Sequence, residues 1–380
     1  MQPNRLLLAA AAGIAVATVY FAQPLLVTMG SDLGIAPGTV GVIVTVTQIG
    51  YGLGLFFLVP LSDLLDRRRL VQVQFLLLAV ALLATALARN AAMLMIGLAA
   101  VGALAVVTQS LVVLGAALSD PAERGRTVGT ITSGIVLGIL LARTASGVLT
   151  DLAGWRAVYL TACALCLLMT LLLNGSAPRS RSGLRYGALL RSTTALWRTE
   201  PLFRESAIRA FFIFASFSTL WSSVTLPLSE RSLSHTEIGA FGLIGAAGAL
   251  AAGPAGRLAD RGYGRVVTTA ASVLLATSWL ITVWTPRSLV ALAIGTILLD
   301  LAVQAVHVTN QSRIYPLRPE AGGRIIGGYM IFYSLGSGTG AIASTMLYER
   351  AGWTGVCILG AAFGLGSVLT TARVSAPLTR

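Results

Sequence analysis

The stretch GRTVGTITSGIVLGILLARTASGVLTDLAGW, residues 125–155, decides the fold because its pattern of small residues returns 198 positions later. Gly125-Arg126, Gly129, Gly138 and Gly154-Trp155 fall on Gly323-Arg324, Gly327, Gly336 and Gly352-Trp353. A fixed offset near half of the 380 residues indicates a duplicated unit of about six hydrophobic segments. Duplicated bundles that rock about a site between them are the common architecture of secondary carriers, so the repeat predicts a transporter.

Composition excludes a water-soluble globule. Hydrophobic residues make up 56% of the chain, charged residues make up 11%, and the mean hydropathy is +0.82. Lipid must therefore solvate much of the surface. Backbone groups that face lipid must bond within their own segment, and the apolar runs are too long for barrel strands. The expected fold class is an all-α polytopic membrane protein.

Twelve apolar stretches have about the length that crosses a hydrocarbon layer of about 30 Å as a helix. They predict two pseudo-symmetric six-helix bundles, residues 1–174 and 206–380, joined by a basic cytoplasmic linker, residues 175–205. The opening run is expected to be a retained helix rather than a signal peptide. The stretches are Leu6–Met29, Thr39–Leu61, Leu70–Leu87, Met93–Leu118, Val128–Leu149, Ala157–Leu173, Ala207–Leu228, Ile238–Leu258, Val266–Trp284, Ser288–Thr309, Ile325–Tyr348 and Gly355–Thr371.

The arginines indicate orientation rather than nucleic-acid binding, although the net charge is +13. All 27 basic residues are Arg; 20 fall on one set of loops and five on the other, with Arg143 and Arg209 inside or bordering spans. The positive-inside rule then places both termini in the cytoplasm of a bacterial inner-membrane protein.

Two further features have mainly structural interpretations. Within the linker, apolar residues at helical spacing alternate with arginines, which predicts an amphipathic helix that serves as a tether, with a regulatory role left open. Cys163 and Cys166 form a C-x-x-C pair inside an apolar span, where buried thiols are expected rather than redox or metal chemistry. No metal site and no cofactor are expected.

A loop after the second span reads PLSDLLDRRR, residues 60–69, and a loop after the eighth reads GRLADRGYGR, residues 256–265. Asp63 and Asp260 are 197 positions apart, so both belong to the repeat. The loops resemble the signature Gly-x-x-x-Asp-Arg-x-Gly-Arg of the major facilitator superfamily, and the likeness extends over the whole chain. The resemblance implies that Asp63 with Arg67, and Asp260 with Arg261, hold the cytoplasmic gate closed in the outward-facing state.

The first loop departs from that signature. Val59, Leu64 and Asp66 stand where the family has Gly, Arg and Gly, whereas Asp260-Arg261 keeps the pattern. A carboxylate near a helix amino terminus or an arginine is favourable by a few tenths to about 1 kcal/mol, which is small enough to be reversed in each transport cycle.

The fifth span resembles the antiporter motif of the same family. Small residues at such spacing let helices approach closely. Arg143 takes the position of the motif's proline, where it either faces a polar cavity or a partner, or snorkels to the outer interface. The matching residues are Gly129, Gly138, Ala142, Ser146 and Gly147.

Asp300 lies near the middle of the tenth span, where a carboxylate costs about 2.5 to 3.5 kcal/mol on insertion scales. Gln304, His307 and Gln311 follow at helical steps, so one face of this span is polar. The repeat relates His307 to Gln109. Asp300 is therefore a candidate to bind and release protons, the alternative being a structural Asp satisfied by a neighbouring helix.

The family resemblance implies that the first, fourth, seventh and tenth spans line a central substrate cavity. The lining residues are then Tyr20, Gln23, Gln109, Trp221, Gln304 and His307. For His307, a structural hydrogen bond to a backbone carbonyl is an equal alternative to a role in the cavity.

These observations predict a proton-coupled antiporter that exports small amphipathic molecules by alternating access, and that is similar to the drug and sugar efflux branch of the superfamily. Asp300 and Arg143 are its proton-coupling residues, its partners are protons, the small-molecule substrate and the lipid bilayer, and we expect a monomer. A proton-independent facilitator or importer is the alternative. An enzyme is not expected because no catalytic motif is present, and an ATP-driven pump is excluded because a phosphate-binding loop needs a lysine.

Overall fold

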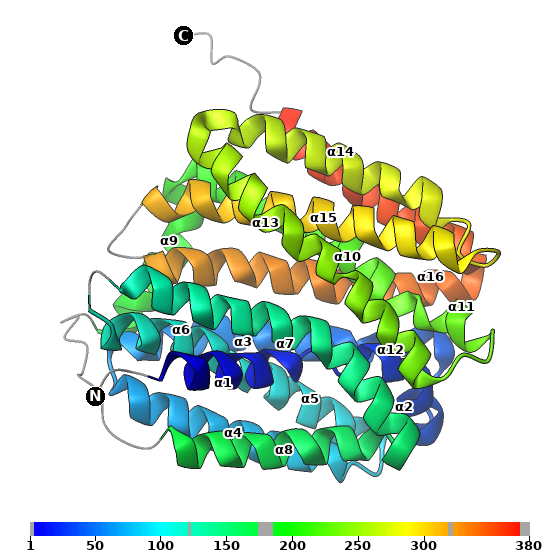
Figure 1. Cartoon of the computed structure of the whole chain (residues 1–380), viewed down its shortest axis with the longest axis horizontal. Coiled ribbons are helices and arrows are strands. Elements are labelled where there is room, and N and C mark those ends of the chain that lie inside the picture. Colours follow the sequence, from blue (N-terminus) through cyan, green and yellow to red (C-terminus); the bar gives the residue numbers. More distant parts are fainter. Residues whose placement is uncertain (1–3, 121–122, 174–184, 318–321, 373–380) are drawn as a thin grey trace. The chain divides into compact units, whose positions relative to one another are not determined.

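The computed structural model describes residues 4–120, 123–173, 185–317 and 322–372, and every regular element in these ranges is helical (Figure 1). The α-helices are α1 (Arg5–Ala17), α2 (Leu26–Leu33), α3 (Val42–Phe57), α4 (Arg67–Ala86), α5 (Ala91–Ala105), α6 (Val107–Leu118), α7 (Arg124–Ala153), α8 (Trp155–Leu172), α9 (Tyr186–Thr199), α10 (Pro201–Ser223), α11 (Thr225–Ser229), α12 (His235–Ile244), α13 (Ala246–Leu258), α14 (Gly264–Thr282), α15 (Leu289–Ile314) and α16 (Gly322–Ala372). Short turns of other helix types are η1 (Gln23–Leu25), η2 (Pro37–Thr39), η3 (Val59–Asp63), η4 (Ala259–Tyr263) and η5 (Tyr315–Leu317).

Within the described ranges, nine helical stretches are long and apolar enough to cross a membrane. Two of them, Leu250–Thr282 and Arg324–Thr371, each contain parts of two predicted spans. The first predicted span is divided between α1, which ends at Ala17, and α2, and Pro24 lies in the short turn η1 between them. The predicted all-α polytopic fold is confirmed.

The chain forms two compact units. The first consists of Met1–Ile35, Val46–Thr193 and Ser234–Gly242, and the second of Ala36–Thr45, Thr194–Leu233 and Leu243–Arg380. Each unit thus takes one short segment from the other half of the sequence. The predicted domain bounds at 174 and 206 stay a prediction.

The amphipathic helix expected in the linker corresponds to α9, whereas residues 175–184 of the predicted linker lie outside the described ranges. Leu189 and Leu196 of α9 are buried. In the second unit, the ring of Trp197 stacks on Phe332 with centroids 4.9 Å apart. Packing of this kind fits the tether interpretation.

The sequence repeat is also a repeat of helix packing. In the first unit α1 packs on α7, and a Cβ atom added to Gly138 would meet the backbone oxygen of Gly13. In the second unit α10 packs on α16, and a Cβ atom on Gly336 would meet the backbone of Phe211. Gly13 and Gly138 lie 198 positions before Phe211 and Gly336, so the same close approach of two helices occurs in each unit.

This close approach gives a stability prediction. We expect Gly138→Ala to destabilise the protein by about 1 to 3 kcal/mol, because the new methyl group displaces the α1 backbone. The matched control is Gly129→Ala, since a Cβ atom there meets nothing within 4 Å. Ala is about 0.5 to 1 kcal/mol better than Gly inside a helix, so the control should be neutral or stabilising. Thermal unfolding in detergent compares the two variants, and equal effects would contradict the packing.

Candidate functional site

Asp300 lies on α15 where this helix packs closely against α13. Its side chain is 7% exposed, and Trp221 Nε1 of α10 donates a hydrogen bond to Asp300 Oδ1 over 3.3 Å. A Cβ atom on Gly248 of α13 would lie 2.9 Å from the backbone oxygen of Asp300. The carboxylate is therefore held inside the second unit at the meeting point of three helices.

The first unit has the same helix contact without the acid. Gly102 stands 198 positions before Asp300, and a Cβ atom on Gly102 would meet the α3 backbone at Thr47. Gly50 of α3 stands in the same way for Gly248, and a Cβ atom on Gly50 would lie 2.1 Å from the backbone oxygen of Ala99 of α5. The packing of this helix pair thus needs no carboxylate, which argues that Asp300 serves something other than the packing.

Aromatic side chains of α10 run along the helix next to Asp300. The ring centroids of Trp221 and Phe217 are 6.2 Å apart, and those of Phe217 and Phe214 are 6.1 Å apart. The ring centroid of Phe214 then lies 4.2 Å from that of Tyr333 on α16 and 5.1 Å from that of His307 on α15. A row of aromatic rings on α10 therefore runs from the tryptophan that contacts the carboxylate to His307, and both Asp300 and His307 lie on α15.

His307 is hydrogen-bonded to the side chains of two neighbouring residues. Its Nδ1 lies 3.0 Å from the hydroxyl of Tyr329, and its Nε2 lies 3.2 Å from Nε2 of Gln311. Gln304 lies between Asp300 and His307 on the same helix and is partly exposed. The second unit thus brings Trp221 together with Asp300, and a row of aromatic rings connects them to His307.

The predicted residues of the first unit meet around Arg143. The guanidinium donates from Nε to Gln23 Oε1 over 2.7 Å and lies 5.2 Å from the centre of the Tyr20 ring. Arg143 is only 3% exposed, which excludes snorkelling to the interface and leaves the alternative of a partner. Gln109 bonds to the hydroxyl of Tyr51, a residue that the sequence reading did not include.

The motif residues of α7 have different surroundings. Ala142 and Ser146 are buried, and Gly147 approaches the backbone of His235. Gly138 makes the contact with α1, whereas Gly129 has open space around it. Close approach therefore explains four of the five small residues and not Gly129.

The two signature loops differ in structure. Asp63 ends η3, and the nearby Arg67 donates from Nε to the backbone oxygen of Ser62 over 3.1 Å. Asp66 is the N-cap of α4 and accepts from the backbone N–H groups of Arg68 and Arg69, which explains its presence where the family signature has glycine. Asp260 and Arg261 lie in η4, which turns at Gly262 with φ 88°. The gating roles stay predictions.

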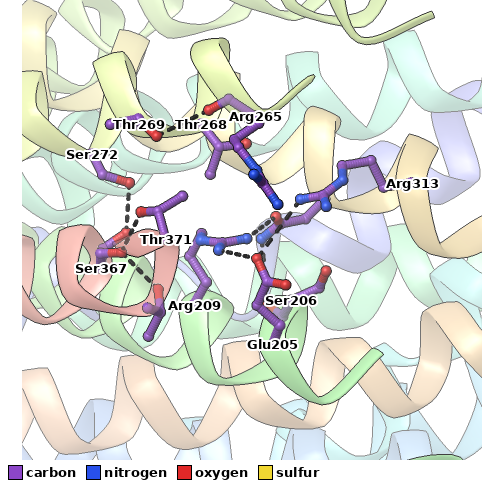
Figure 2. A network of polar contacts seen from close by, with 12 residues as sticks. Glu205, Ser206, Arg209, Arg265, Thr268, Thr269, Ser272, Arg313, Ser367 and Thr371 are labelled. Carbon is purple, nitrogen blue, oxygen red and sulfur yellow. Dashed lines mark hydrogen bonds and ion pairs between the residues drawn. The ribbon is translucent and has the colours of Figure 1, made fainter. Parts of the chain in front are cut away.

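A network of charged residues in the second unit was missed from the sequence (Figure 2). Glu205 of α10 accepts from Arg209 one turn later, and Arg313 of α15 lies 3.8 Å from the same oxygen. Arg209 is fully buried and also donates to Asn310 Oδ1 over 3.1 Å. The spacing of Glu205 and Arg209 by four residues is a helical ion-pair signal that could have identified the pair.

The sequence matches the family described as Major Facilitator Superfamily over residues 8–231 and 206–379. It is 43% identical over 367 residues to the putative uncharacterized transporter YgaY of Escherichia coli K12, which covers 96% of this chain and 93% of that protein. It is 31% identical to the probable transporter SCO4007 of Streptomyces coelicolor, covering 97% of this chain and 86% of that protein. The solved structure of a D-xylose-proton symporter has a TM-score of 0.75 at 12% identity, covering 97% of this chain and 96% of that one, which shows likeness of fold.

Proposed function

The chain belongs to the Major Facilitator Superfamily and is a multi-pass membrane transporter rather than an enzyme, and on that premise we propose that it is a proton-coupled antiporter. Its substrates are small amphipathic molecules, of the drug or sugar efflux type, and it exports them across the bacterial inner membrane by alternating access. It acts as a monomer with both termini in the cytoplasm.

The observation that carries this proposal is the burial of Asp300. A carboxylate inside a membrane span is costly, and the equivalent helix contact in the first unit uses glycine instead. The Trp221 N–H is a suitable partner for the ionised form, and the neighbouring aromatic rings suit an amphipathic substrate. In the proposed cycle Asp300 takes up a proton from outside and releases it inwards as substrate binds.

Arg143 is proposed as the second coupling residue. Its positive charge is buried against Gln23 and Tyr20, so a change in those contacts would alter the energy of the surrounding helices. We assign it to holding one conformation of the cycle, while the loop residues Asp63, Arg67, Asp260 and Arg261 act at the cytoplasmic gate. One proton moving down 100 mV releases about 2.3 kcal/mol, enough for roughly a 50-fold substrate gradient.

The proposal is tested with purified protein in proteoliposomes and an imposed pH gradient. A panel of amphipathic compounds is screened for uptake and efflux, and an entrapped pH dye follows protons. We expect each transported compound to move protons in the opposite direction. Measurable transport of a compound without any proton movement would end the antiport proposal and favour a facilitator.

A further inference from the structure

The start of α12 is fixed within the first unit by three side chains that the sequence reading did not single out. His235 Nδ1 lies 2.6 Å from Asp151 Oδ1 at the end of α7, and His235 Nε2 lies 2.6 Å from Thr28 Oγ1 on α2. The imidazole therefore joins α12 to two other segments of the unit, and we call these three residues the latch.

Asp151 makes more bonds than helix capping requires. Its Oδ2 accepts from the backbone N–H of Thr236 over 2.8 Å and from the Thr236 hydroxyl over 2.6 Å. However, α12 already has its own capping box, in which Ser234 Oγ accepts from the N–H of Glu237 and the carboxylate of Glu237 accepts from Ser234. The additional carboxylate from α7 therefore docks α12 onto α7.

The next two turns of α12 cover Arg143. Thr144 Oγ1 donates to the backbone oxygen of Gly239 over 3.0 Å. A Cβ atom on Gly239 would meet the backbone oxygen of Arg143, and one on Gly242 would lie 2.9 Å from the Cβ atom of Arg143. Glycine at these two positions lets α12 lie directly on the aliphatic stem of Arg143.

The latch holds both neighbours of Arg143 at once. On one side Arg143 has the glycine face of α12, and on the other it has Gln23. Thr28 follows Gln23 by five residues on the chain and is bonded to the same His235 that starts α12. Loss of the latch would release both elements that fix the guanidinium.

The repeat shows which part of this arrangement is special. In the second unit a Cβ atom on Gly41 would meet the backbone oxygen of Ala341, and one on Gly38 would meet the carboxylate of Glu349. Gly41, Ala341, Gly38 and Glu349 are each 198 positions from Gly239, Arg143, Thr236 and Asp151, in that order. The short segment that each unit takes from the other half of the sequence therefore docks in the same way in both units. The second unit has Pro37 in place of His235 and alanine in place of the arginine.

From this geometry we infer that Asp151 and His235 are positioning residues that hold Arg143 in place through α12. The inference rests on the proposed function, because it assumes that Arg143 takes part in transport. It assigns to the outer end of α7 a role that the family likeness does not supply.

A double-mutant cycle tests this inference. Asp151→Asn and Arg143→Gln are each expected to lower the transport rate by about tenfold, and the double variant should be no slower than Arg143→Gln alone. If the latch served only stability, the two losses of transport rate would multiply in the double variant. That result would overturn the inference. Gly242→Ala, which leaves the latch intact and presses on the Arg143 stem, should reproduce the loss.

Asp32 provides the matched control. It lies at the same end of the unit, and hydrogen bonds from Arg156 over 2.6 Å and from Trp155 over 3.1 Å hold its pKa below the usual value. It does not belong to the latch. We expect Asp32→Asn to change transport by the same factor in the wild-type and Arg143→Gln backgrounds.

Hydrogen exchange separates the inference from the proposed function. Amides of Thr236–Gly242 should exchange at least about tenfold faster in Asp151→Asn than in the intact protein in nanodiscs. Unchanged exchange would overturn the latch, whatever transport shows. Absence of proton movement with the intact protein would instead overturn the antiport proposal, while the cycle and the exchange data would still decide the latch.

Discussion

We expect the Asp300→Asn variant to move substrate only down its own concentration gradient. Asparagine keeps the shape of the side chain and an acceptor for the Trp221 N–H, which lies 3.3 Å from the carboxylate. It cannot carry a proton, so a pH gradient or membrane potential no longer drives export. With 100 mV imposed, the steady-state gradient should fall from roughly 50-fold to about 1, as measured in proteoliposomes.

Downhill exchange separates loss of coupling from loss of fold. Asp300→Asn should still exchange labelled for unlabelled substrate, and Asp300→Glu should recover part of the uphill transport. The control is Asp32→Asn, which removes a carboxylate outside the spans and should leave the gradient unchanged. An Asp300→Asn variant that retained the full gradient would contradict the assignment.

The second large effect is expected at Glu205. Replacement by Leu leaves Arg209 as a fully buried guanidinium that has lost its carboxylate partner. Removing one member of a buried ion pair costs about 3 to 5 kcal/mol, since the remaining charge stays desolvated. The free energy of unfolding in a mixed detergent titration should fall by that amount.

Two variants define how this loss should be interpreted. Arg313→Gln breaks an ion pair of 3.8 Å whose arginine is 23% exposed, so it should cost less than about 1 kcal/mol. Glu205→Leu combined with Arg209→Leu removes both charges and should recover most of the stability. A loss below about 1 kcal/mol in Glu205→Leu alone would contradict the burial of this pair.

Much of the fold could be predicted from the sequence because the membrane restricts the possibilities. A span of about 20 apolar residues has one stable form, and the repeat gives the two-part organisation directly. The break after Ala17 was missed, whereas the bend at Gly352, where φ is 61°, falls between the predicted spans Ile325–Tyr348 and Gly355–Thr371. Hydropathy averages over a window and does not detect a local break of a few residues.

The site was predicted where a single residue violates the rules of its environment. Asp300 and Arg143 are conspicuous because charges in apolar spans are costly, and the repeat pointed to Gln109. The partners were harder to predict. Asp151, His235 and Thr28 lie far apart in sequence and meet through the crossing of three helices. Such pairings depend on helix rotation and tilt, which spacing along one helix does not encode.

Asp66 is an example of a signal that could have been used. Its position in the first loop is a departure from the family signature, which has glycine there. An aspartate directly before a helical run is also an N-cap signal, and the structure shows it accepting from the backbone N–H groups of Arg68 and Arg69. Family comparison and local physics gave different interpretations of the same residue, and the local one is confirmed.

Asp300 binds and releases a proton in the proposed transport cycle. Infrared difference spectroscopy of the purified protein, titrated with acid, tests it without knowledge of the substrate. We expect a carbonyl stretch of a protonated carboxylic acid that appears within the physiological pH range in the intact protein and is missing in Asp300→Asn. Identical difference spectra for the two proteins across that range would contradict it.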